Sequence, residues 1–320
     1  MPSQPRPDFL LPPHWRLDAI YATARPHHPA VSPDGSQVAF ILSAEGTSDL
    51  HTVPVSGGQA RRLTTNRKLA SYWEDTAPRW SPDGSEIAYT SGDDTFVVDF
   101  EGGPPRRIPG VALGDWLTDT EMVVIVDRKR TSRLALVDVD DPWPQPFGPK
   151  GGDVGQVSVA EDGRIVATFW PRDDFSRSDI VVASAGGEWS TLVGHEDRRA
   201  LDPAVTGTRV AYALEDGDWR AVYLTDLDGA SHDLLAKDDA DFSDLQWSID
   251  GRLVAVRARH GQADLVTIAG DGTVEVVSEG GFWQTPQWAG DSLIAAYESH
   301  DTAPRLVSLD GTKPRTLLDG

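Results

Sequence analysis

Cysteine is absent from this sequence of 320 residues. Disulfides, thiolate nucleophiles, iron–sulfur clusters and cysteine-ligated zinc sites are therefore excluded. Basic residues are also few, with 29 Lys and Arg against 50 Asp and Glu, which gives a formal charge of −21. A field of that sign repels the phosphates of nucleic acid and the anionic surface of a membrane, so we expect neither as a partner.

Long apolar runs are missing as well. Near the N-terminus only Phe9, Leu10 and Leu11 follow one another, and a secretory signal needs a longer apolar stretch. Nothing in the chain approaches the roughly 20 apolar residues of a membrane-spanning helix. We therefore expect a soluble, cytoplasmic protein.

Sequence patterns that are typical of metal-binding or cofactor-binding sites are scarce. The 8 histidines include no helical i, i+4 pair, and the adjacent His27 and His28 would point to opposite faces of a strand. Acidic segments 138–141 and 238–241 contain residues of the kind that bind calcium, but neither continues as a 12-residue loop with its Gly and terminal Glu. We expect no metal and no cofactor.

A repeated sequence motif occurs along most of the chain. A Val or Trp precedes a turn built around Asp-Gly, and a hydrophobic run follows. The clearest copies are Val31–Gly35 and Trp80–Gly84, and weaker ones begin at Trp116, Val159, Val205, Trp247 and Trp288. Between Asp34 and Asp291 the six intervals average about 43 residues, the period of a four-stranded propeller blade.

The predicted fold is therefore all-β, a seven-bladed β-propeller of four-stranded blades over residues 28–320. Residues 1–27 form an N-terminal extension, in which segment 9–25 has the pattern of a short amphipathic helix. The recurrent Trp80, Trp116, Trp247 and Trp288 occupy one repeat position, which predicts that they pack between blades. Blade 3 carries Pro142, Pro144, Pro146 and Pro149 where its fourth strand belongs, and proline is tolerated on an outermost strand and hardly elsewhere.

Topology fixes which loops share a face. In a blade of antiparallel strands A to D, the B–C loops, the D–A linkers and both ends of the propeller must lie on the same side. We call this side the loop-rich face. The opposite side, the turn face, carries the short A–B and C–D turns.

The Ser-Pro-Asp-Gly turns resemble those of TolB-like propellers. Pro29–Gly35 after the predicted helix and Ala77–Gly84 one blade later are similar to the N-terminal propeller of prolyl-oligopeptidase-type (S9) serine peptidases, in particular the acylaminoacyl-peptidase branch. The resemblance in architecture extends over all 320 residues of the chain. It implies a C-terminal α/β-hydrolase domain as partner and short peptides as substrates.

The sequence departs from that family in one respect. It contains no Gly-x-Ser-x-Gly nucleophile elbow, so we expect no catalytic residue in this chain. Three hypotheses follow. The chain is the non-catalytic, substrate-gating part of a serine exopeptidase or oligopeptidase, truncated before its hydrolase domain; or it is a stand-alone propeller that acts as a protein-interaction scaffold. A propeller enzyme such as a lactonase would need a ring of metal ligands on the axis, for which the sequence offers no set.

The expected substrate contacts lie on the loop-rich face. The B–C loop of blade 4 packs charged and aromatic side chains closely, and an Asp pair can hold an α-amino group while an Arg fork can hold a carboxylate. An exposed docking face would also favour self-association of the chain. The predicted substrate-binding residues are Trp170, Arg172, Asp173, Asp174 and Arg177 of that loop, Arg130 with its neighbours Arg128 and Arg133 in blade 3, and Trp73 and Glu74 before blade 2.

Overall fold

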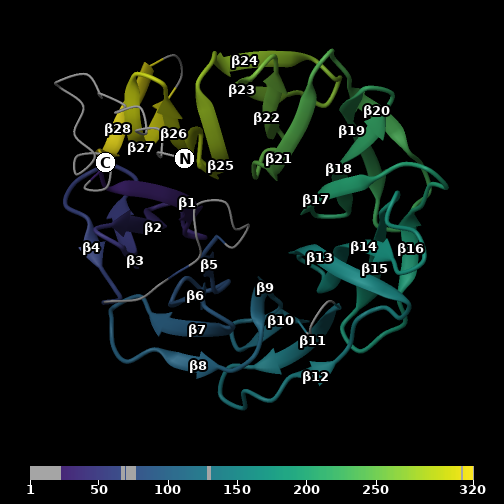
Figure 1. Cartoon of the computed structure of the whole chain (residues 1–320), viewed down its shortest axis with the longest axis horizontal. Coiled ribbons are helices and arrows are strands. Elements are labelled where there is room, and N and C mark those ends of the chain that lie inside the picture. Colours follow the sequence, from purple (N-terminus) through teal and green to yellow (C-terminus); the bar gives the residue numbers. More distant parts are fainter. Residues whose placement is uncertain (1–22, 66–68, 70–76, 128–130, 311–312, 320) are drawn as a thin grey trace, which may run out of the picture.

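The hydrophobic run after each Asp-Gly turn forms the second strand of a four-stranded antiparallel sheet, and seven such sheets surround a central axis in the computed structural model (Figure 1). The structure describes residues 23–65, 69, 77–127, 131–310 and 313–319. The predicted seven-bladed, all-β architecture is confirmed. These described residues include no helix, and most of the segment predicted as an N-terminal helix lies outside them.

Each of the first four blades consists of four consecutive strands in spatial order. Blade 1 contains β1 (Arg25–Val31), β2 (Gln37–Ala44), β3 (Thr47–Pro54) and β4 (Arg61–Arg62). Blade 2 contains β5 (Arg79–Trp80), β6 (Glu86–Ser91), β7 (Asp94–Asp99) and β8 (Arg106–Ile108). Blade 3 contains β9 (Ala112–Trp116), β10 (Glu121–Asp127), β11 (Ser132–Asp138) and β12 (Gln145–Pro146). Blade 4 contains β13 (Gly152–Val159), β14 (Arg164–Pro171), β15 (Asp179–Ser184) and β16 (Ser190–Val193).

The last three blades follow the same order. Blade 5 contains β17 (Ala200–Thr206), β18 (Arg209–Asp216), β19 (Trp219–Asp226) and β20 (Asp233–Ala236). Blade 6 contains β21 (Asp241–Trp247), β22 (Leu253–Arg259), β23 (Gln262–Ile268) and β24 (Val274–Ser278). Blade 7 contains β25 (Phe282–Ala289), β26 (Ser292–Ser299), β27 (Thr302–Asp310) and β28 (Lys313–Asp319).

Two boundaries differ in detail from the sequence expectation. Strand β1 begins at Arg25, within the segment assigned to the N-terminal extension. In blade 3 the proline-rich segment still supplies the outer strand, but β12 pairs with β11 over two residues only, Gln145 and Pro146. Pro146 has no N–H to extend the ladder, so this outer strand is short.

The core lies between blades rather than inside any one of them. Side chains of strand β22 show why its run is apolar throughout: Leu253 and Ala255 join the cluster shared with blade 5, while Val254 and Val256 join the cluster shared with blade 7. Both faces of the sheet are therefore buried. Alternation between apolar and polar residues, which marks a half-exposed strand, is replaced by a continuous hydrophobic run.

The Ser-Pro-Asp-Gly sequence forms its turn through a small hydrogen-bond network. In blade 1, Ser32 Oγ donates to Asp34 Oδ1 at 2.6 Å and accepts from the Gln37 N–H at 3.0 Å. The same Asp34 oxygen accepts the Ser36 N–H at 3.0 Å. Gly35 takes a φ of 72°, a left-handed conformation that glycine adopts without strain. These contacts lower the pKa of the Asp34 carboxyl, with the Ser32 hydroxyl as the main cause.

The recurrent tryptophans bridge neighbouring blades, as predicted from their shared repeat position. Each indole N–H donates to a backbone carbonyl of the innermost strand in the preceding blade. The four pairs are Trp80 with Ala30 at 2.9 Å, Trp116 with Arg79 at 3.0 Å, Trp247 with Ala204 at 3.0 Å and Trp288 with Gln246 at 3.3 Å.

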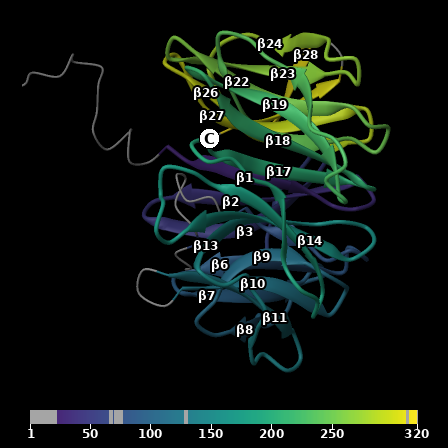
Figure 2. The same ribbon diagram turned by 90° about the vertical axis from the view of Figure 1, so that its right-hand side faces the viewer.

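The disc has two unlike faces, seen edge-on in Figure 2, where strands run from one face to the other. Because every blade is an antiparallel series A to D, β1 starts and β28 ends on the loop-rich face. Within the described residues no helix is long and apolar enough to cross a membrane.

Blades 1 and 7 close the ring through side chains. Phe40 and Val53 of blade 1 pack against Ile294 and Leu306 of blade 7, and Arg315 donates to the Val55 and Ser56 carbonyls at 2.7 and 2.6 Å. Among the described strands, each of these two sheets is built from its own end of the chain.

Candidate functional site

The B–C loop of blade 4 connects β14 to β15 on the loop-rich face, and Arg177 anchors it. The guanidinium Nε of Arg177 lies 3.4 Å from Asp174 Oδ2, and its Nη1 lies 3.5 Å from Asp179 Oδ1. Nη1 also donates to the His195 carbonyl at 3.1 Å. Arg177 thus ties the loop to the linker that leads into blade 5, and its charge is already engaged.

The carboxylates around Arg177 differ in environment. Asp179 is buried, and burial raises the pKa of its carboxyl while Arg177 opposes that shift. The pKa of Asp174 is lowered instead, chiefly because the Ser176 hydroxyl and then the Ser176 N–H donate to it. Beside them, burial and the Arg198 charge lower the pKa of His195. Arg198 Nη2 lies 3.0 Å from His195 Nδ1.

Arg172, Asp173 and Phe175 point to solvent at the tip of the same loop. Among the described residues, neither the Arg172 nor the Asp173 side chain has a hydrogen bond or an ion pair. The Phe175 ring is 64% exposed. One loop therefore presents a cation, an anion and an aromatic ring that are available to a ligand.

Trp170 lies at the end of β14, where it packs against the innermost strand of its own blade. A Cβ added to Gly155 would come within 3.1 Å of the Trp170 ring, and one added to Gly152 would come within 2.2 Å of the Trp170 carbonyl oxygen. Gly155 thus makes room for the indole, and Gly152 makes room for the Trp170 backbone and the Phe169 ring. The side chain is half-buried, so only part of its ring is available to a ligand.

The structure brings together only some of the predicted substrate-binding residues. The five residues of the blade 4 loop lie near one another. Arg133 donates from Nη1 to the Gly152 carbonyl at 2.6 Å and lies in blade 3. Trp73, Glu74, Arg128 and Arg130 lie outside the described residues.

A second polar region lines the axis of the propeller and was not predicted from the sequence. The innermost strands of six blades carry a β-bulge there. At five of these bulges, all except the one in blade 3, one residue other than glycine adopts a φ near 50°, an uncommon conformation. These residues are His28, Gln156, Asp202, Asp244 and Thr285.

A repeat signal for these bulges exists in the sequence. Each of the five residues lies three positions before the Val or Trp that precedes the Asp-Gly turn. A polar residue that recurs at one repeat position of the innermost strand is the pattern that would have identified them. The equivalent residues in blades 2 and 3 are Ala77 and Leu113, which are buried and apolar.

Four of these five residues, Gln156, Asp202, Asp244 and Thr285, line an axial cavity of about 140 Å³ whose lining comes from blades 2 to 7. Arg79 lines it and is a cation whose guanidinium has no hydrogen bond or ion pair among the described residues. Burial raises the pKa of the nearby Asp115 carboxyl, and the Arg79 charge opposes that shift. Asp115 Oδ2 also accepts the Val159 N–H at 3.1 Å.

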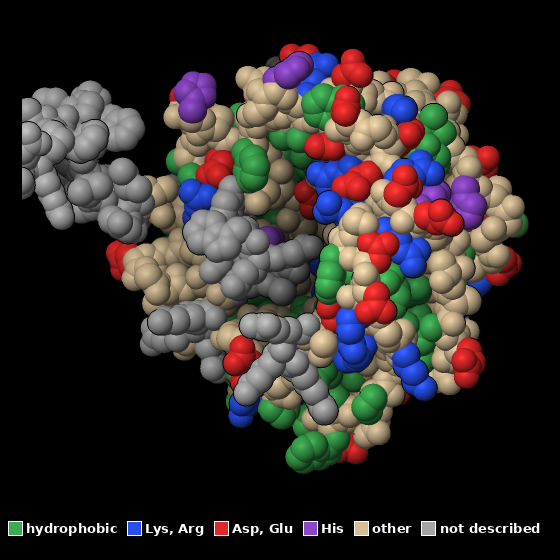
Figure 3. All heavy atoms as spheres, turned by 45° about the vertical axis from the view of Figure 1, so that its right-hand side comes forward, with side chains coloured by type: hydrophobic (Ala, Val, Ile, Leu, Met, Phe, Trp, Pro, Cys, Tyr) green, Lys and Arg blue, Asp and Glu red, His purple; other side chains and the backbone are tan. Residues whose placement is uncertain are grey.

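Charge is mixed on the visible surface. Figure 3 views the disc obliquely and shows acidic and basic side chains interspersed beside the central hollow rather than one acidic patch. No group of three or more His, Asp or Glu residues in the described part of the chain has the arrangement of a metal site. The exposed Arg172 and Asp173 side chains can form ion pairs and hydrogen bonds with a polar ligand.

No family model matches the chain. Among curated proteins, the Tricorn protease homolog 1 of Streptomyces coelicolor is 26% identical over 249 residues, which cover 68% of this chain and 21% of that protein. The Tol-Pal system protein TolB of Chromobacterium violaceum is 37% identical over 145 residues, covering 41% of this chain and 33% of TolB. The matched region thus spans a third or less of the length of these relatives.

Solved structures match almost the whole chain. A puromycin-hydrolyzing peptidase of Mycobacterium tuberculosis superposes with a TM-score of 0.76 at 16% identity, over 94% of this chain and 54% of that one. The acylaminoacyl peptidase of Pyrococcus horikoshii gives 0.71 at 17% identity, over 95% and 54%. The β-propeller domain of the Trilobed protease from Pyrococcus furiosus, which has an open velcro topology, gives 0.71 at 15% identity, over 93% and 96%. At the level of the fold, the resemblance inferred from the Ser-Pro-Asp-Gly turns is confirmed.

Proposed function

We propose that this chain is the propeller part of a serine peptidase of the prolyl-oligopeptidase type and itself carries no catalytic group. The observation that carries the proposal is the extent of the structural match: 94–95% of this chain corresponds to 54% of two peptidases. A propeller of this size thus accounts for about half of a peptidase chain. In this proposal an α/β-hydrolase domain is the partner and short peptides are the substrates.

The loop-rich face would pack against the hydrolase domain. B–C loops and D–A linkers gather there, and the chain enters β1 and leaves β28 on that side. Phe175 is 64% exposed on this face, and an exposed aromatic ring is the kind of group that a partner surface buries. The turn face would point away from the partner.

Within this arrangement, Arg172 and Asp173 are the proposed contacts for a peptide end. Both are exposed and lack partners among the described residues, whereas Arg177 is held by Asp174, Asp179 and the His195 carbonyl. A free guanidinium can take a carboxylate or carbonyl oxygen through its fork, and a free carboxylate can take an α-amino group. Arg177 and Asp174 would position the loop rather than touch the peptide.

Two measurements test the proposal. The first is the coding sequence beyond codon 320: a Gly-x-Ser-x-Gly elbow roughly 150 to 200 residues downstream supports it, and an immediate stop codon overturns it. The second uses the longer protein with short peptides as substrates. Arg172→Ala should raise KM about tenfold, the cost of one charge-assisted contact. Arg107→Ala, which removes an exposed arginine of blade 2, serves as the matched control. Equal KM values for the two variants would remove Arg172 from the substrate site.

A stand-alone interaction scaffold is the second candidate function. The match that favours it is TolB, at 37% identity over 145 residues. The coding sequence separates the two: a reading frame that ends at residue 320 leaves the scaffold, with partners that would be sought on the loop-rich face.

A further inference from the structure

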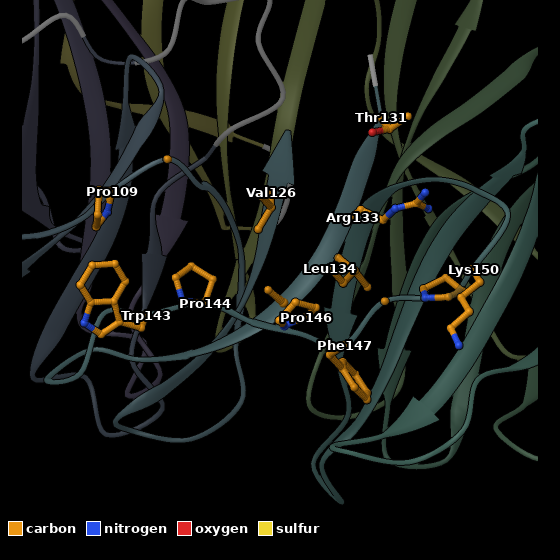
Figure 4. A pocket seen from close by; sticks show the side chains of 14 residues that line it. Pro109, Val126, Thr131, Arg133, Leu134, Trp143, Pro144, Pro146, Phe147 and Lys150 are labelled. Atoms are coloured by element: carbon orange, nitrogen blue, oxygen red, sulfur yellow. The ribbon is translucent and has the colours of Figure 1, made fainter. Parts of the chain in front are cut away.

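A groove of about 850 Å³ runs along the outer side of blade 3, away from the central axis. It lies between the linker that precedes β9, the outer strands β11 and β12 and the linker that precedes β13 (Figure 4). We call it the blade-3 groove. Its lining includes Pro109, Arg133, Trp143, Pro144, Pro146 and Lys150.

One end of the groove is apolar and open to water. The Trp143 ring is 70% exposed, and Figure 4 shows it beside Pro109 and Pro144. Pro142 and Pro144 flank Trp143 and restrict the backbone of this segment. Free energy is gained when a ligand covers an apolar surface that is otherwise exposed to water.

The other end carries two cations. Figure 4 shows Arg133 and Lys150 on the side of the groove opposite Trp143. Arg133 is half-buried, and its hydrogen bond is to the Gly152 carbonyl at 2.6 Å. Among the described residues, neither Arg133 nor Lys150 has a carboxylate within ion-pair distance.

The two cations are thus not neutralised by neighbouring carboxylates. The chain has 50 acidic residues against 29 basic ones, and some arginines elsewhere do pair with carboxylates, as Arg106 does with Glu86 and Arg164 with Asp162 at 2.8 Å. Two cations beside an apolar surface form a pattern that complements a ligand with an apolar body and one carboxylate.

We propose that the blade-3 groove binds the C-terminal end of a short apolar peptide, with the terminal carboxylate at the end of the groove that carries Arg133 and Lys150 and the preceding side chains packed on Trp143 and the prolines. The volume accommodates a ligand of several residues. This site is separate from the blade 4 loop, and its test uses the present chain alone, so it stands or falls independently of the peptidase proposal.

A peptide suits the groove better than a fatty acid does. Because Trp143 is largely exposed, the apolar end of the groove is open to solvent, and an alkyl chain bound there would remain partly in water. A peptide covers the ring and prolines with alternate side chains while its backbone groups keep their hydrogen bonds to solvent. An aromatic surface that faces an extended peptide is a common mode of recognition.

The test measures fluorescence anisotropy of an N-terminally labelled peptide of sequence Gly-Ser-Pro-Leu-Pro-Phe, made with a free C-terminus and as the C-terminal amide. The free acid should bind the wild-type chain about tenfold more tightly than the amide. Arg133→Gln and Lys150→Gln should each reduce that preference, while Trp143→Ala should weaken both peptides and leave the preference in place. Arg199→Gln, which removes an exposed arginine of the blade 4 to blade 5 linker, should behave as wild type.

The outcomes separate the alternatives. Equal affinity for acid and amide, or no saturable binding at millimolar protein, overturns the proposal. Displacement of the labelled acid by dodecanoate at lower concentration than by the unlabelled peptide overturns it in favour of a fatty acid. Circular dichroism of each variant shows that it is folded, and Lys150→Gln, which changes an exposed side chain, keeps the test decisive if Arg133→Gln does not fold.

Discussion

The indole nitrogen of Trp247 lies 3.0 Å from the carbonyl oxygen of Ala204, in the innermost strand of the preceding blade. Arg209, from that same preceding blade, covers the ring at 4.7 Å from its centroid. Trp247 therefore joins two blades by a hydrogen bond, a cation–π contact and apolar packing at once. Arg252 and Trp288 repeat the arrangement one blade later, at 4.6 Å.

Replacing Trp247 separates these contributions. Trp247→Phe keeps an aromatic ring but leaves the Ala204 carbonyl without its donor, so we expect a loss of about 1 kcal/mol in the free energy of unfolding. Trp247→Ala should cost about 3–5 kcal/mol because it also leaves a cavity. Urea denaturation measures both. Trp143→Phe, at an exposed ring, should stay within about 0.5 kcal/mol of wild type, and an equal effect at the two positions would contradict the bridging role.

His27 makes the stability of the propeller depend on pH. Burial, with smaller effects of His28 and Arg25, lowers the pKa of His27 from 6.5 to about 3. The unfolded chain therefore binds a proton at a higher pH than the folded chain does. The contribution of His27 is fully present above pH 6.5 and is lost as the pH falls toward 3. Between pH 6.5 and 4.5 we expect the free energy of unfolding to fall by about 2 kcal/mol from this group.

The measurement is a set of urea melts across that pH range for wild type, His27→Gln and His260→Gln. Gln does not titrate, so His27→Gln should flatten the dependence, while His260→Gln, at an exposed histidine, should retain it. A wild-type dependence unchanged by His27→Gln would show that other groups carry it.

Arg177 should control the order of the blade 4 loop. Its removal releases Asp174, Asp179 and the His195 carbonyl together, so Arg177→Ala should cost on the order of 1 kcal/mol in local opening and speed amide hydrogen exchange of residues 172–176 about fivefold. Arg172→Ala at the tip of the same loop should leave the exchange rates unchanged. Similar rates in both variants and wild type would contradict the anchoring role.

The chain by itself should hydrolyse neither peptides nor esters. The sequence has no nucleophile elbow, and the acyl-transfer reaction needs a nucleophile, a base and an oxyanion hole in one site. Assays with peptide p-nitroanilides and a p-nitrophenyl ester check this. Turnover clearly above that of a heat-treated sample would refute the prediction.

The fold could largely be predicted because the sequence motif of each blade recurs at a regular interval. The motif from Val31 to Gly35 recurs regularly enough to predict the number of blades. The continuous hydrophobic run of each second strand is explained by the packing of both faces of the sheet against neighbouring blades. The four bridging tryptophans were predictable for the same reason. The start of β1 at Arg25 was not, because residues 25–27 precede the first turn and carry no repeat signal.

For the candidate site, the sequence predicted which loop is involved but not the role of each residue in it. Topology assigns the blade 4 loop to the loop-rich face, but the sequence does not tell Arg172 from Arg177. Their difference arises from the His195 carbonyl and Asp179, groups that the fold brings next to Arg177. The axial bulges were missed because a single Asp or Gln inside a strand, such as Asp202 or Gln156, does not indicate a bulge. The pattern becomes visible only when the repeats are aligned.

The seam between blades 1 and 7 has a consequence for how the chain can be rearranged. Every blade is one contiguous stretch of sequence, and the seam uses side-chain packing and the Arg315 hydrogen bonds to Val55 and Ser56. Joining the two ends of the propeller by a linker and opening the chain between β16 and β17 would therefore yield a circular permutant that keeps all seven blades intact. In that permutant the former seam would be covalently linked, and the contact between blades 4 and 5, with its Tyr212 and Val182 packing, would become the junction that no covalent bond crosses.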